Sequence, residues 1–551
     1  MLMMLAASMA GPSLLASPHD RKGRSAVRRT VNIMNFIRAE EPRESMDLFL
    51  PVRKQMELIK AHGFPATWLL QFDAVVEGPF LAYLQQEIPA SHEIGLWLEN
   101  NRKLCDAAGI AWRGKPDWEW DYHVPVAYSI GYQPDDRKRL ADAAMGGFRK
   151  AVGYYPKAVA SWNLDAVTVA HLAEHYAVEA LGNCRDQLAT DGFTIWGSPI
   201  TAYYPSRINA WSCALRAENQ IPVQIFRLLG QDPVYYYDKV FAYPDTMEPV
   251  WPSGRSAAFV DSFYEMMAHA PAGRLAYAQL GQENSFGWPE MQEAYGMQLD
   301  KLAETVRTSS VVVEPMSATG RHFRRQFAQT PVQMQIMLAD PYGKKELPER
   351  TIWYQSRFYR ANLHFRGDDV YLRDLFVYSD RFPQIYLHDT ATQHGIDQIG
   401  LAVLDGYHWS RKPGDVDKRD GAAQGVFTLS DGAGRALVLR FAGEPSAHEA
   451  EDTLHVQVPL EHGVMATFTF SEQRLVMLFS GVQENQVAGM RLCWEQARSS
   501  FVGVEGTSLR YRYRDFHYAV EVERGTARPT DDGVLLAAGD GVLQLRLAQP
   551  E

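Results

Sequence analysis

Cysteine is scarce in this chain. The 551 residues include only Cys105, Cys184, Cys213 and Cys493, which are far apart. No CxxC pair and no Cys/His cluster indicates a zinc site, and nothing indicates a disulfide framework, so we expect four free and buried cysteines. Beyond the N-terminal region, no segment has the roughly 18 consecutive apolar residues of a membrane helix. The sequence therefore predicts no membrane span.

Motifs for several common chemistries are also missing. There is no P-loop, no GxGxxG that opens a βαβ unit, no GxSxG and no HExxH, so nucleotide-binding, serine-hydrolase and metalloprotease functions lack support. The formal net charge is -11. Proteins that bind nucleic acid or anionic membranes usually present a basic face, so the charge argues against both partners. We expect no cofactor and no nucleic-acid partner.

The N-terminal region resembles a leader. Residues 1–17 are rich in Ala, Leu and Met and end in Leu-Ala-Ser, like the apolar core of a secretory signal. No basic segment precedes them, and a start codon assigned too early would give a similar stretch. A secreted or periplasmic location and a cytoplasmic one therefore both stay open. We exclude residues 1–28 from the predicted fold.

The remaining chain divides into two parts. Between residues 29 and 345, apolar strand-like runs alternate with amphipathic helices, which predicts parallel βαβ units. Seven or eight units are expected, enough to close a β/α barrel, with Pro289–Thr308 as the last helix. From residue 346 to 551, short alternating segments are separated by Gly- and Asp-containing turns. We predict an α/β fold: a barrel of seven or eight strands followed by an antiparallel β-sandwich.

The segment VNIMNFIRAEEPR, residues 31–43, shows where a site is expected. An apolar strand ends there in Arg38, Glu40, Glu41 and Arg43. A β/α barrel carries its chemistry where its strands end. Charged groups at such a place are costly to bury unless a polar site uses them. We expect Glu40 to act as a base there, although a solvated loop with salt bridges is the alternative.

Two later segments supply further catalytic candidates. Asp121 and His123 flank one residue, so both side chains point to one side of an extended chain. Asp121 would raise the pKa of His123, which could then act as a general acid, unless the pair is structural. Glu283 and Asn284 follow the last expected strand and could supply an acid and a sugar-hydroxyl partner. Trp288 could add a stacking ring.

Other residues near strand ends are substrate-binding candidates. Arg38, Arg43, Arg185 and Arg227 lie at or near predicted strand ends; if two or more of them converge, they could clamp a substrate carboxylate, and an acidic sugar would follow. Each arginine alone is better explained as a salt-bridge partner. Asp165 could bind substrate or cap the next helix, a position that Asp favours. Trp162 beside it could be a subsite floor or a core ring.

Three stretches carry a resemblance to a known family: PATWLLQFDA, SHEIGLWLE and GYYPKAVASWNLDA. They resemble the polysaccharide-deacetylase-like (NodB-like) β/α barrel superfamily and its glycosidase relatives, over roughly residues 30–190. That family continues its His-Glu-Ile-Gly strand into two metal-binding histidines, but residues 96–99 read Leu-Trp-Leu-Glu here. Its usual Asp-Asp pair after the first strand is replaced by residues 35–41. The resemblance implies the fold without the family's metal-dependent deacetylation.

These observations predict a metal-independent glycoside hydrolase acting on an oligosaccharide or glycoconjugate. An acidic sugar and a sialidase-like, inverting mechanism with a His/Asp acid-base pair fit the candidates. One alternative is a polysaccharide deacetylase or carbohydrate esterase with a rearranged metal site of Asp73, Asp121 and His123. The other is a non-catalytic glycan-binding protein. A carbohydrate is the expected partner in each case, and the oligomeric state, including a homodimer, stays open.

Overall fold

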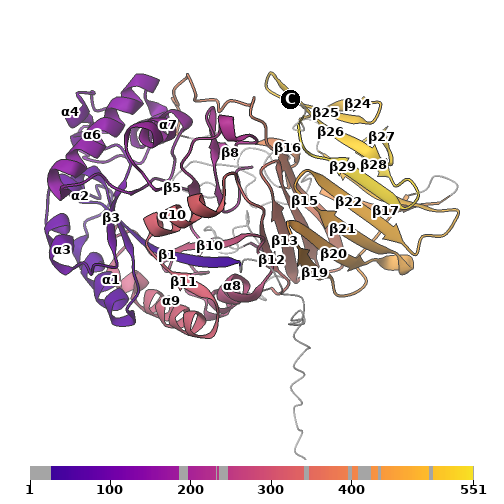
Figure 1. Ribbon diagram of the computed structural model, residues 1–551, viewed down its shortest axis with the longest axis horizontal. Helices are drawn as coiled ribbons and strands as arrows, with labels where there is room; N and C mark the ends of the chain where they lie inside the picture. Colours follow the sequence, from indigo (N-terminus) through magenta and orange to yellow (C-terminus); the bar gives the residue numbers. More distant parts are fainter. Residues whose placement is uncertain are drawn as a thin grey trace, which may run out of the picture.

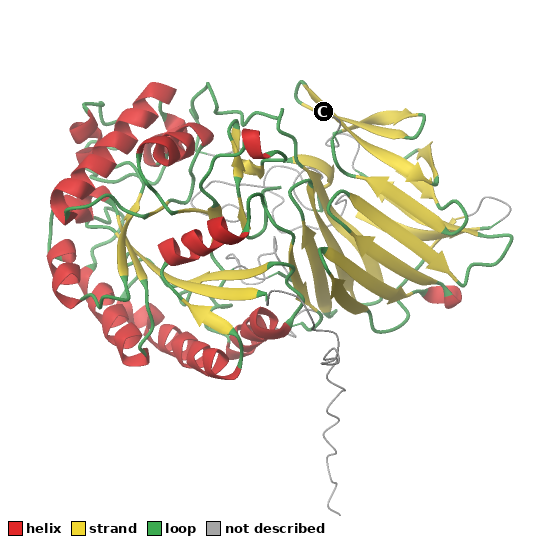
Figure 2. Cartoon of the chain, in the orientation of Figure 1, coloured by secondary structure: helices red, strands yellow, loops and turns green. Residues whose placement is uncertain are grey.

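A computed structural model gives the structure of the chain. It describes residues 27–184, 197–230, 233–234, 246–340, 347–394, 400–406, 424–431, 436–494 and 500–549. Helices surround a curved sheet on the left of Figures 1 and 2, and antiparallel sheets form the right-hand part. This mixed α/β architecture, with a barrel-like sheet followed by antiparallel sheets, agrees with the predicted class.

The barrel-like sheet has the strand order β10-β1-β2-β3-β4-β5-β9-β6. Strands β1 to β5, β9 and β10 pair in parallel, and β6 pairs with β9 antiparallel. They are almost wholly buried, which explains their near-continuous apolar runs. Because these strands are parallel, their C-terminal ends lie at one edge of the sheet. The bounds are β1 Arg28–Ile37, β2 Thr67–Leu70, β3 Glu93–Trp97, β4 Ala158–Ala160, β5 Ala180–Cys184, β6 Ala202–Tyr203, β9 Ile225–Leu228 and β10 Leu275–Leu280.

Helices cover the outside of this sheet (Figure 1). The long ones bury one apolar stripe each; α6, for example, buries Leu140, Met145 and Phe148. Gly63 ends α1 with φ 68°, the left-handed C-cap conformation that glycine favours. The bounds are α1 Phe49–His62, α2 Phe72–Val76, α3 Phe80–Glu87, α4 Arg102–Ala108, α5 Val124–Ala127, α6 Pro134–Val152, α7 Ala166–His175, α8 Ala257–His269 and α9 Trp288–Thr308.

The expectation that residues 289–308 complete the barrel is wrong. Strand β11 (Val311–Val313) pairs in parallel with β1, and helix α10 (Met316–Gln326) packs against β5 and β1. The sequence of α10 is mostly polar and β11 is only three residues long, so neither contains a long apolar run. Their packing is decided by contacts with β1, far away in the sequence, so the pattern of residues 309–326 alone did not predict them.

The second part of the chain is a sandwich of two antiparallel sheets, ordered β12-β13-β14-β15-β17-β23-β28-β27 and β19-β20-β21-β22-β29-β26-β25-β24. Their inner faces share one core, in which the rings of Phe427 and Phe468 lie 5.1 Å apart. β12 pairs with β13, so this sheet begins before residue 346. The bounds are β12 Gln333–Met337, β13 Glu349–Gln355, β14 Tyr359–Arg366, β15 Asp369–Val377, β16 Leu401–Leu404, β17 Gln424–Ser430, β18 Ala436–Val438, β19 Ser446–Ala450, β20 Thr453–Pro459, β21 Met465–Phe470, β22 Arg474–Ser480, β23 Val487–Cys493, β24 Phe501–Glu505, β25 Ser508–Tyr513, β26 Phe516–Arg524, β27 Thr526–Thr530, β28 Gly533–Ala537 and β29 Val542–Arg546.

The remaining global expectations concern cysteines and membranes. All four cysteines are free; Cys105, Cys184 and Cys213 are buried, and Cys493 is partly exposed. Within the described ranges, no helix is long and apolar enough to cross a membrane. The predicted leader falls almost entirely on residues 1–26, which lie outside the described residues.

Candidate active site

A cavity of about 310 Å³ lies at the C-terminal edge of the parallel strands. Its wall includes residues that follow β1, β4, β9 and β10, which is where a β/α barrel places its chemistry. The volume is at the lower end of the range for small-molecule sites. The lining residues are Glu41, Arg43, Glu44, Met46, Trp162, Leu229, Glu248, Trp251, Glu283, Ser285, Phe286, Gly287 and Glu290.

Arg38 stands behind this cavity with 1% of its surface exposed. Its Nη2 lies 3.0 Å from Glu283 Oε2 and 3.4 Å from Glu99 Oε2, and its Nη1 lies 3.6 Å from Glu41 Oε2. The guanidinium also covers the ring of Trp120 at 4.0 Å. A buried charge is tolerated only when it is paired in this way. The three glutamates thus explain how the charged end of β1 is buried.

Glu41 joins the two arginines that follow β1. Arg43 donates to both of its carboxylate oxygens at 2.7 Å, a bidentate pair. Burial alone would raise the pKa of Glu41, but the hydrogen bonds from Arg43 and the charge of Arg38 lower it overall. Arg38 and Arg43 therefore do converge, as the sequence suggested, but glutamates already occupy them.

Glu248 is a hydrogen-bonded carboxyl in the cavity wall. Trp251 Nε1 donates to it at 3.1 Å, Thr246 Oγ1 at 3.2 Å and Gln282 Nε2 at 3.4 Å. Glu248 is half-buried and stays partly open to the cavity. Burial, together with the negative charge of Glu283, raises the pKa of Glu248 to about 7. Such a carboxyl can both take and give a proton at neutral pH.

Asn284 fixes the position of Arg38. Its Oδ1 accepts a hydrogen bond from the Arg38 backbone N–H, and its Nδ2 donates to the carbonyls of Arg38 and Leu48, each at 2.9 Å. Asn284 is fully buried. Its place in the fold is therefore to hold the chain after β1, and it does not line the cavity.

Asp121 and His123 meet beside the cavity. His123 Nδ1 lies 2.5 Å from Asp121 Oδ1, and the backbone N–H of Lys115 also donates to Asp121. Burial works to raise the pKa of Asp121, but the hydrogen bonds from His123 and Lys115 lower it overall. Tyr122 stacks on His123 at 4.5 Å, and Arg43 lies 5.2 Å from the Tyr122 ring. The pair thus adjoins the mouth through Tyr122 and Arg43 without lining the cavity.

The other predicted site residues are dispersed. Trp162 lines the cavity, whereas Glu40 is exposed and is not part of its wall. Asp165 is fully buried and caps α7, accepting from the backbone N–H groups of Val167 and Thr168, so it serves the fold. Trp288 begins α9 and lies beside Tyr295, outside the cavity lining. Arg185 lies outside the described residues.

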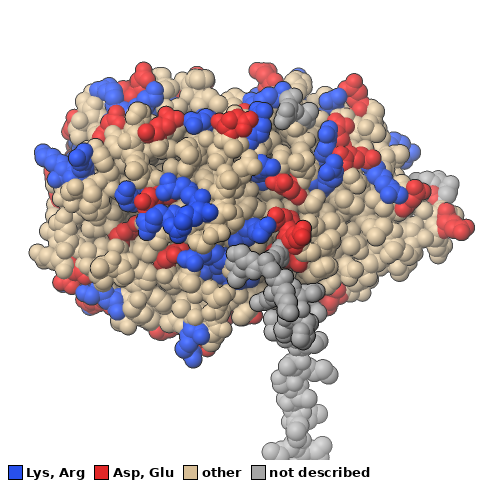
Figure 3. Space-filling model, in the orientation of Figure 1, with Lys and Arg blue, Asp and Glu red and all other residues tan. Residues whose placement is uncertain are grey.

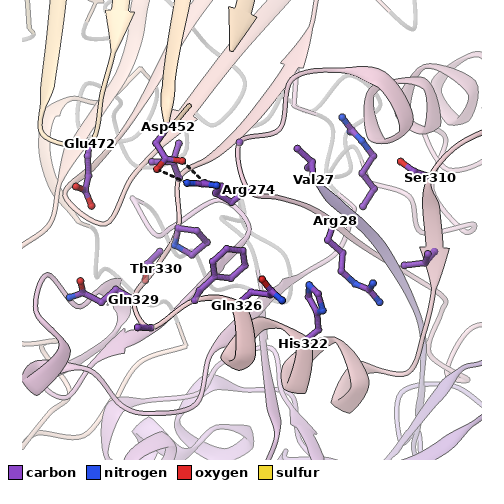
Figure 4. A pocket seen from close by; sticks show the side chains of 17 residues that line it. Val27, Arg28, Arg274, Ser310, His322, Gln326, Gln329, Thr330, Asp452 and Glu472 are labelled. Atoms are coloured by element: carbon purple, nitrogen blue, oxygen red, sulfur yellow. Dashed lines mark hydrogen bonds and ion pairs between the residues drawn. The ribbon is translucent and has the colours of Figure 1, made fainter. Parts of the chain in front are cut away.

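A larger cavity of about 600 Å³ lies at the opposite ends of the strands, where the barrel meets the sandwich. Figure 4 shows Arg274 and Asp452 facing each other across part of it, with Arg274 Nε 2.6 Å from Asp452 Oδ1. Lys and Arg gather on this side of the molecule, over the place of α10 (Figure 3). Arg28 in its wall is paired with Glu314. Arg28 and Arg274 in this cavity are therefore paired with acids, and the cavity lies at the opposite end of the barrel from Glu248 and Glu283.

No family model matches the chain, and no curated protein matches it by sequence. Solved structures do resemble it. A Parabacteroides distasonis protein named as a glycoside hydrolase/deacetylase matches with a TM-score of 0.50 and 14% identity, over 67% of this chain and 88% of its own. The barrel has the polysaccharide-deacetylase-like fold. A Mycobacterium smegmatis protein named as a polysaccharide deacetylase matches with a TM-score of 0.35 and 12% identity, over 57% and 95%. A family 4 carbohydrate esterase from Streptomyces lividans matches with a TM-score of 0.26 and 8% identity, over 52% and 93%.

The prediction of a glycoside hydrolase is wrong on these comparisons. The Parabacteroides distasonis protein is named for deacetylation as well as glycoside hydrolysis, and the other similar structures are mainly deacetylases and carbohydrate esterases, which release acyl groups. The sialidase-like, inverting mechanism depended on that prediction and is wrong for the same reason. An acidic sugar is also disfavoured by charge, because five glutamates and one arginine line the cavity and would repel a substrate carboxylate.

The polysaccharide-deacetylase-like fold implies a divalent metal, but the residues at these strand ends do not fit one. In the part of the chain that the structure describes, no three His, Cys, Asp or Glu side chains gather so that they could hold an ion. The proposed set of Asp73, Asp121 and His123 is therefore not assembled. Asp73 is buried and accepts the backbone N–H groups of Ala39 and Ala74. Asp121 is bonded to His123.

Sequence reasoning missed the groups that complete the cavity, chiefly Glu248, Trp251 and Phe286. Glu248 and Trp251 lie in the irregular segment before α8, where no periodic pattern distinguishes a wall residue from a surface one. The Met-Glu-Pro context of Glu248 carries no motif. Phe286 lies between the predicted residues Asn284 and Trp288, but Trp288 has the larger ring and was the aromatic residue chosen as a stacking candidate.

Proposed function

We propose that this chain is a carbohydrate deacetylase or esterase that removes an acyl group from a sugar at the cavity. The observation that carries the proposal is Glu248, a carboxyl with a pKa of about 7 in the cavity wall, beside Glu283. The deacetylase activity named for the Parabacteroides distasonis protein supplies the reaction class, and the shared fold makes that class a reasonable starting point.

Hydrolysis would use residues of the chain itself. Glu248, when ionised, takes a proton from a water molecule, whose oxygen attacks the acyl carbon. The protonated Glu248 then returns the proton to the leaving amine or hydroxyl as its bond to the acyl carbon breaks. The products are a carboxylate and a sugar with a free amine or hydroxyl group.

Aromatic rings would hold the sugar. Trp162 and Trp251 line the cavity together with Phe286, and the rings of Trp251 and Phe286 meet edge to face at 5.6 Å. Flat rings in a cavity wall pack against the apolar faces of pyranose rings, while the glutamates can accept hydrogen bonds from sugar hydroxyls. This combination supports a carbohydrate in preference to a wholly apolar ligand.

The test is a panel of N-acetylated and O-acetylated oligosaccharides, with chromogenic glycosides as the comparison class. We expect acetate release from at least one acetylated sugar and no glycoside cleavage. Glu248→Gln should lower kcat/KM for acetate release by about 100-fold or more, the usual effect of losing a general base. Glu293→Gln, an exposed site on α9, should leave it unchanged. Equal activity of the two variants would refute the role of Glu248.

A further inference from the structure

We propose that the guanidinium of Arg38 is the built-in cation of the active site, standing where this fold would otherwise hold a divalent metal. The proposal takes only the location of the site from the proposed function. Its evidence is the ion-pair geometry around Arg38, and its first two tests, on metal binding and on Tm, have readouts that do not depend on acyl hydrolysis.

The place of Arg38 is the first line of evidence. Arg38 directly follows β1, in the stretch that replaces the acidic pair expected there from the family resemblance. Its partner Glu99 lies just beyond the end of β3, in the stretch that replaces the expected histidines. One ion pair, with Nη2 3.4 Å from Oε2, therefore joins the two positions at which metal ligands are missing.

The charge balance is the second line of evidence. Glu41, Glu99 and Glu283 come from the ends of three different strands and meet at one guanidinium. Their side chains are at most 10% exposed, so water contributes little to their solvation. Buried carboxylates need a nearby cation, and a planar guanidinium can supply several donors in fixed directions. Glu41 is also paired with Arg43, so the loss of Arg38 would remove positive charge chiefly from Glu99 and Glu283.

Its fixed position is the third line of evidence. Trp120 covers one face of the guanidinium at 4.0 Å, and Ser285 Oγ accepts from Nη1 at 3.0 Å. Asn284 bonds both the backbone N–H and the backbone carbonyl of Arg38. The group is therefore held as rigidly as a bound ion would be. It cannot leave the site, and it occupies the space between the carboxylates.

Through Glu283, Arg38 acts on the proposed base. Glu283 pairs with Arg38 at 3.0 Å, and its negative charge also acts on Glu248. Arg38 offsets part of that negative charge. It is thus a positioning residue, which holds Glu283 and limits the field at Glu248 without touching the reacting atoms.

The first experiment measures thermal unfolding and Mn²⁺ titration calorimetry of the wild-type protein. We expect millimolar Mn²⁺ to leave Tm unchanged and the titration to show no stoichiometric binding at this site. One equivalent of Mn²⁺ bound by the wild type, with binding abolished by Glu99→Gln, would overturn the proposal, because the native cluster would then take a metal despite Arg38.

The second experiment compares the direction of the Tm change that Glu99→Gln causes in the wild type and in Arg38→Met. In the wild type, Glu99→Gln removes an ion pair and should lower Tm. In Arg38→Met, the same change removes an uncompensated buried charge and should raise Tm. A fall of Tm in both backgrounds would overturn the proposal. If Arg38→Met fails to fold, its double variant with Glu99→Gln should restore a cooperative unfolding transition, and failure of both would count against the proposal.

Arg38→Lys separates charge from shape. It keeps the cation, so its pH dependence of kcat/KM should match that of the wild type. Arg38→Met, which exposes Glu248 to more negative charge, should reach half-maximal activity at a higher pH. Identical pH profiles for the lysine and methionine variants would contradict a role of the charge.

Discussion

The unfolding free energy of Glu248→Gln, compared with that of the wild type, should be more favourable at pH 8 than at pH 4.5. In the folded protein the pKa of Glu248 is about 7, against an ordinary 4.5, mainly because burial disfavours the ionised form. The unfolded chain therefore ionises first as the pH rises. The folded state binds more protons than the unfolded state between these values, so the wild type loses stability there. Glutamine does not titrate and escapes this loss.

The magnitude follows from the two pKa values. Each tenfold difference in proton affinity corresponds to about 1.4 kcal/mol, so the step from 4.5 to about 7 gives a penalty of about 3 kcal/mol in full. Glu248 is partly open to the cavity, and water there reduces the penalty to about 1–2 kcal/mol. The loss of a hydrogen bond to glutamine adds a cost that does not depend on pH. The pH-dependent part is therefore the quantity to measure.

Denaturant unfolding of the wild type and of Glu248→Gln at pH 4.5, 6, 7 and 8 would measure it. The difference in unfolding free energy between the two should move in favour of the variant from pH 4.5 to about 7 and then stay level. Glu293→Gln provides the matched control at an exposed position on α9, and its difference from the wild type should stay flat. A flat difference for Glu248→Gln as well would refute the raised pKa and the acid-base role built on it.

Two further predictions concern neighbouring groups. Burial raises the pKa of Asp73 to about 7 from an ordinary 3.8, so the wild type loses stability between pH 5 and pH 8 and Asp73→Asn should gain stability relative to it. Urea unfolding at the two pH values checks this. An unchanged difference in unfolding free energy would contradict it. His123→Ala should lower kcat/KM by about 10-fold or less, since His123 adjoins the mouth only through Tyr122; acetate release checks this, and a loss as large as that of Glu248→Gln would make His123 part of the chemistry.

The fold was largely predictable because its parallel strands are short apolar runs separated by amphipathic helices. Helices such as α6 bury a single apolar stripe, which is a pattern that a sequence displays. The failures lie where long-range contacts decide the structure. β11 depends on pairing with β1, and β12 depends on pairing with β13, so neither has a sufficient local pattern.

The site was predictable in part for the same reason. Strand ends are visible in a sequence, so Arg38, Arg43 and Glu283 were found. Which of two adjacent glutamates turns inward is not visible, and Glu41, not Glu40, proved to be the buried one. Glu248 comes from an irregular segment that only tertiary packing brings to the cavity. The arginines suggested an anionic substrate because the sequence did not show which glutamates pair with them. Glu99 and Glu283, which pair with Arg38, come from other strand ends, far away in the sequence.

The most direct measurement of the central claim is acetate release from an N-acetylated or O-acetylated oligosaccharide after exhaustive treatment of the protein with a chelator. The account predicts that release continues at the untreated rate, and that Glu248→Gln lowers it by about 100-fold or more. Release that is abolished by chelation and restored by a divalent metal would contradict the account, because the carboxylates around Arg38 would then not be the working site.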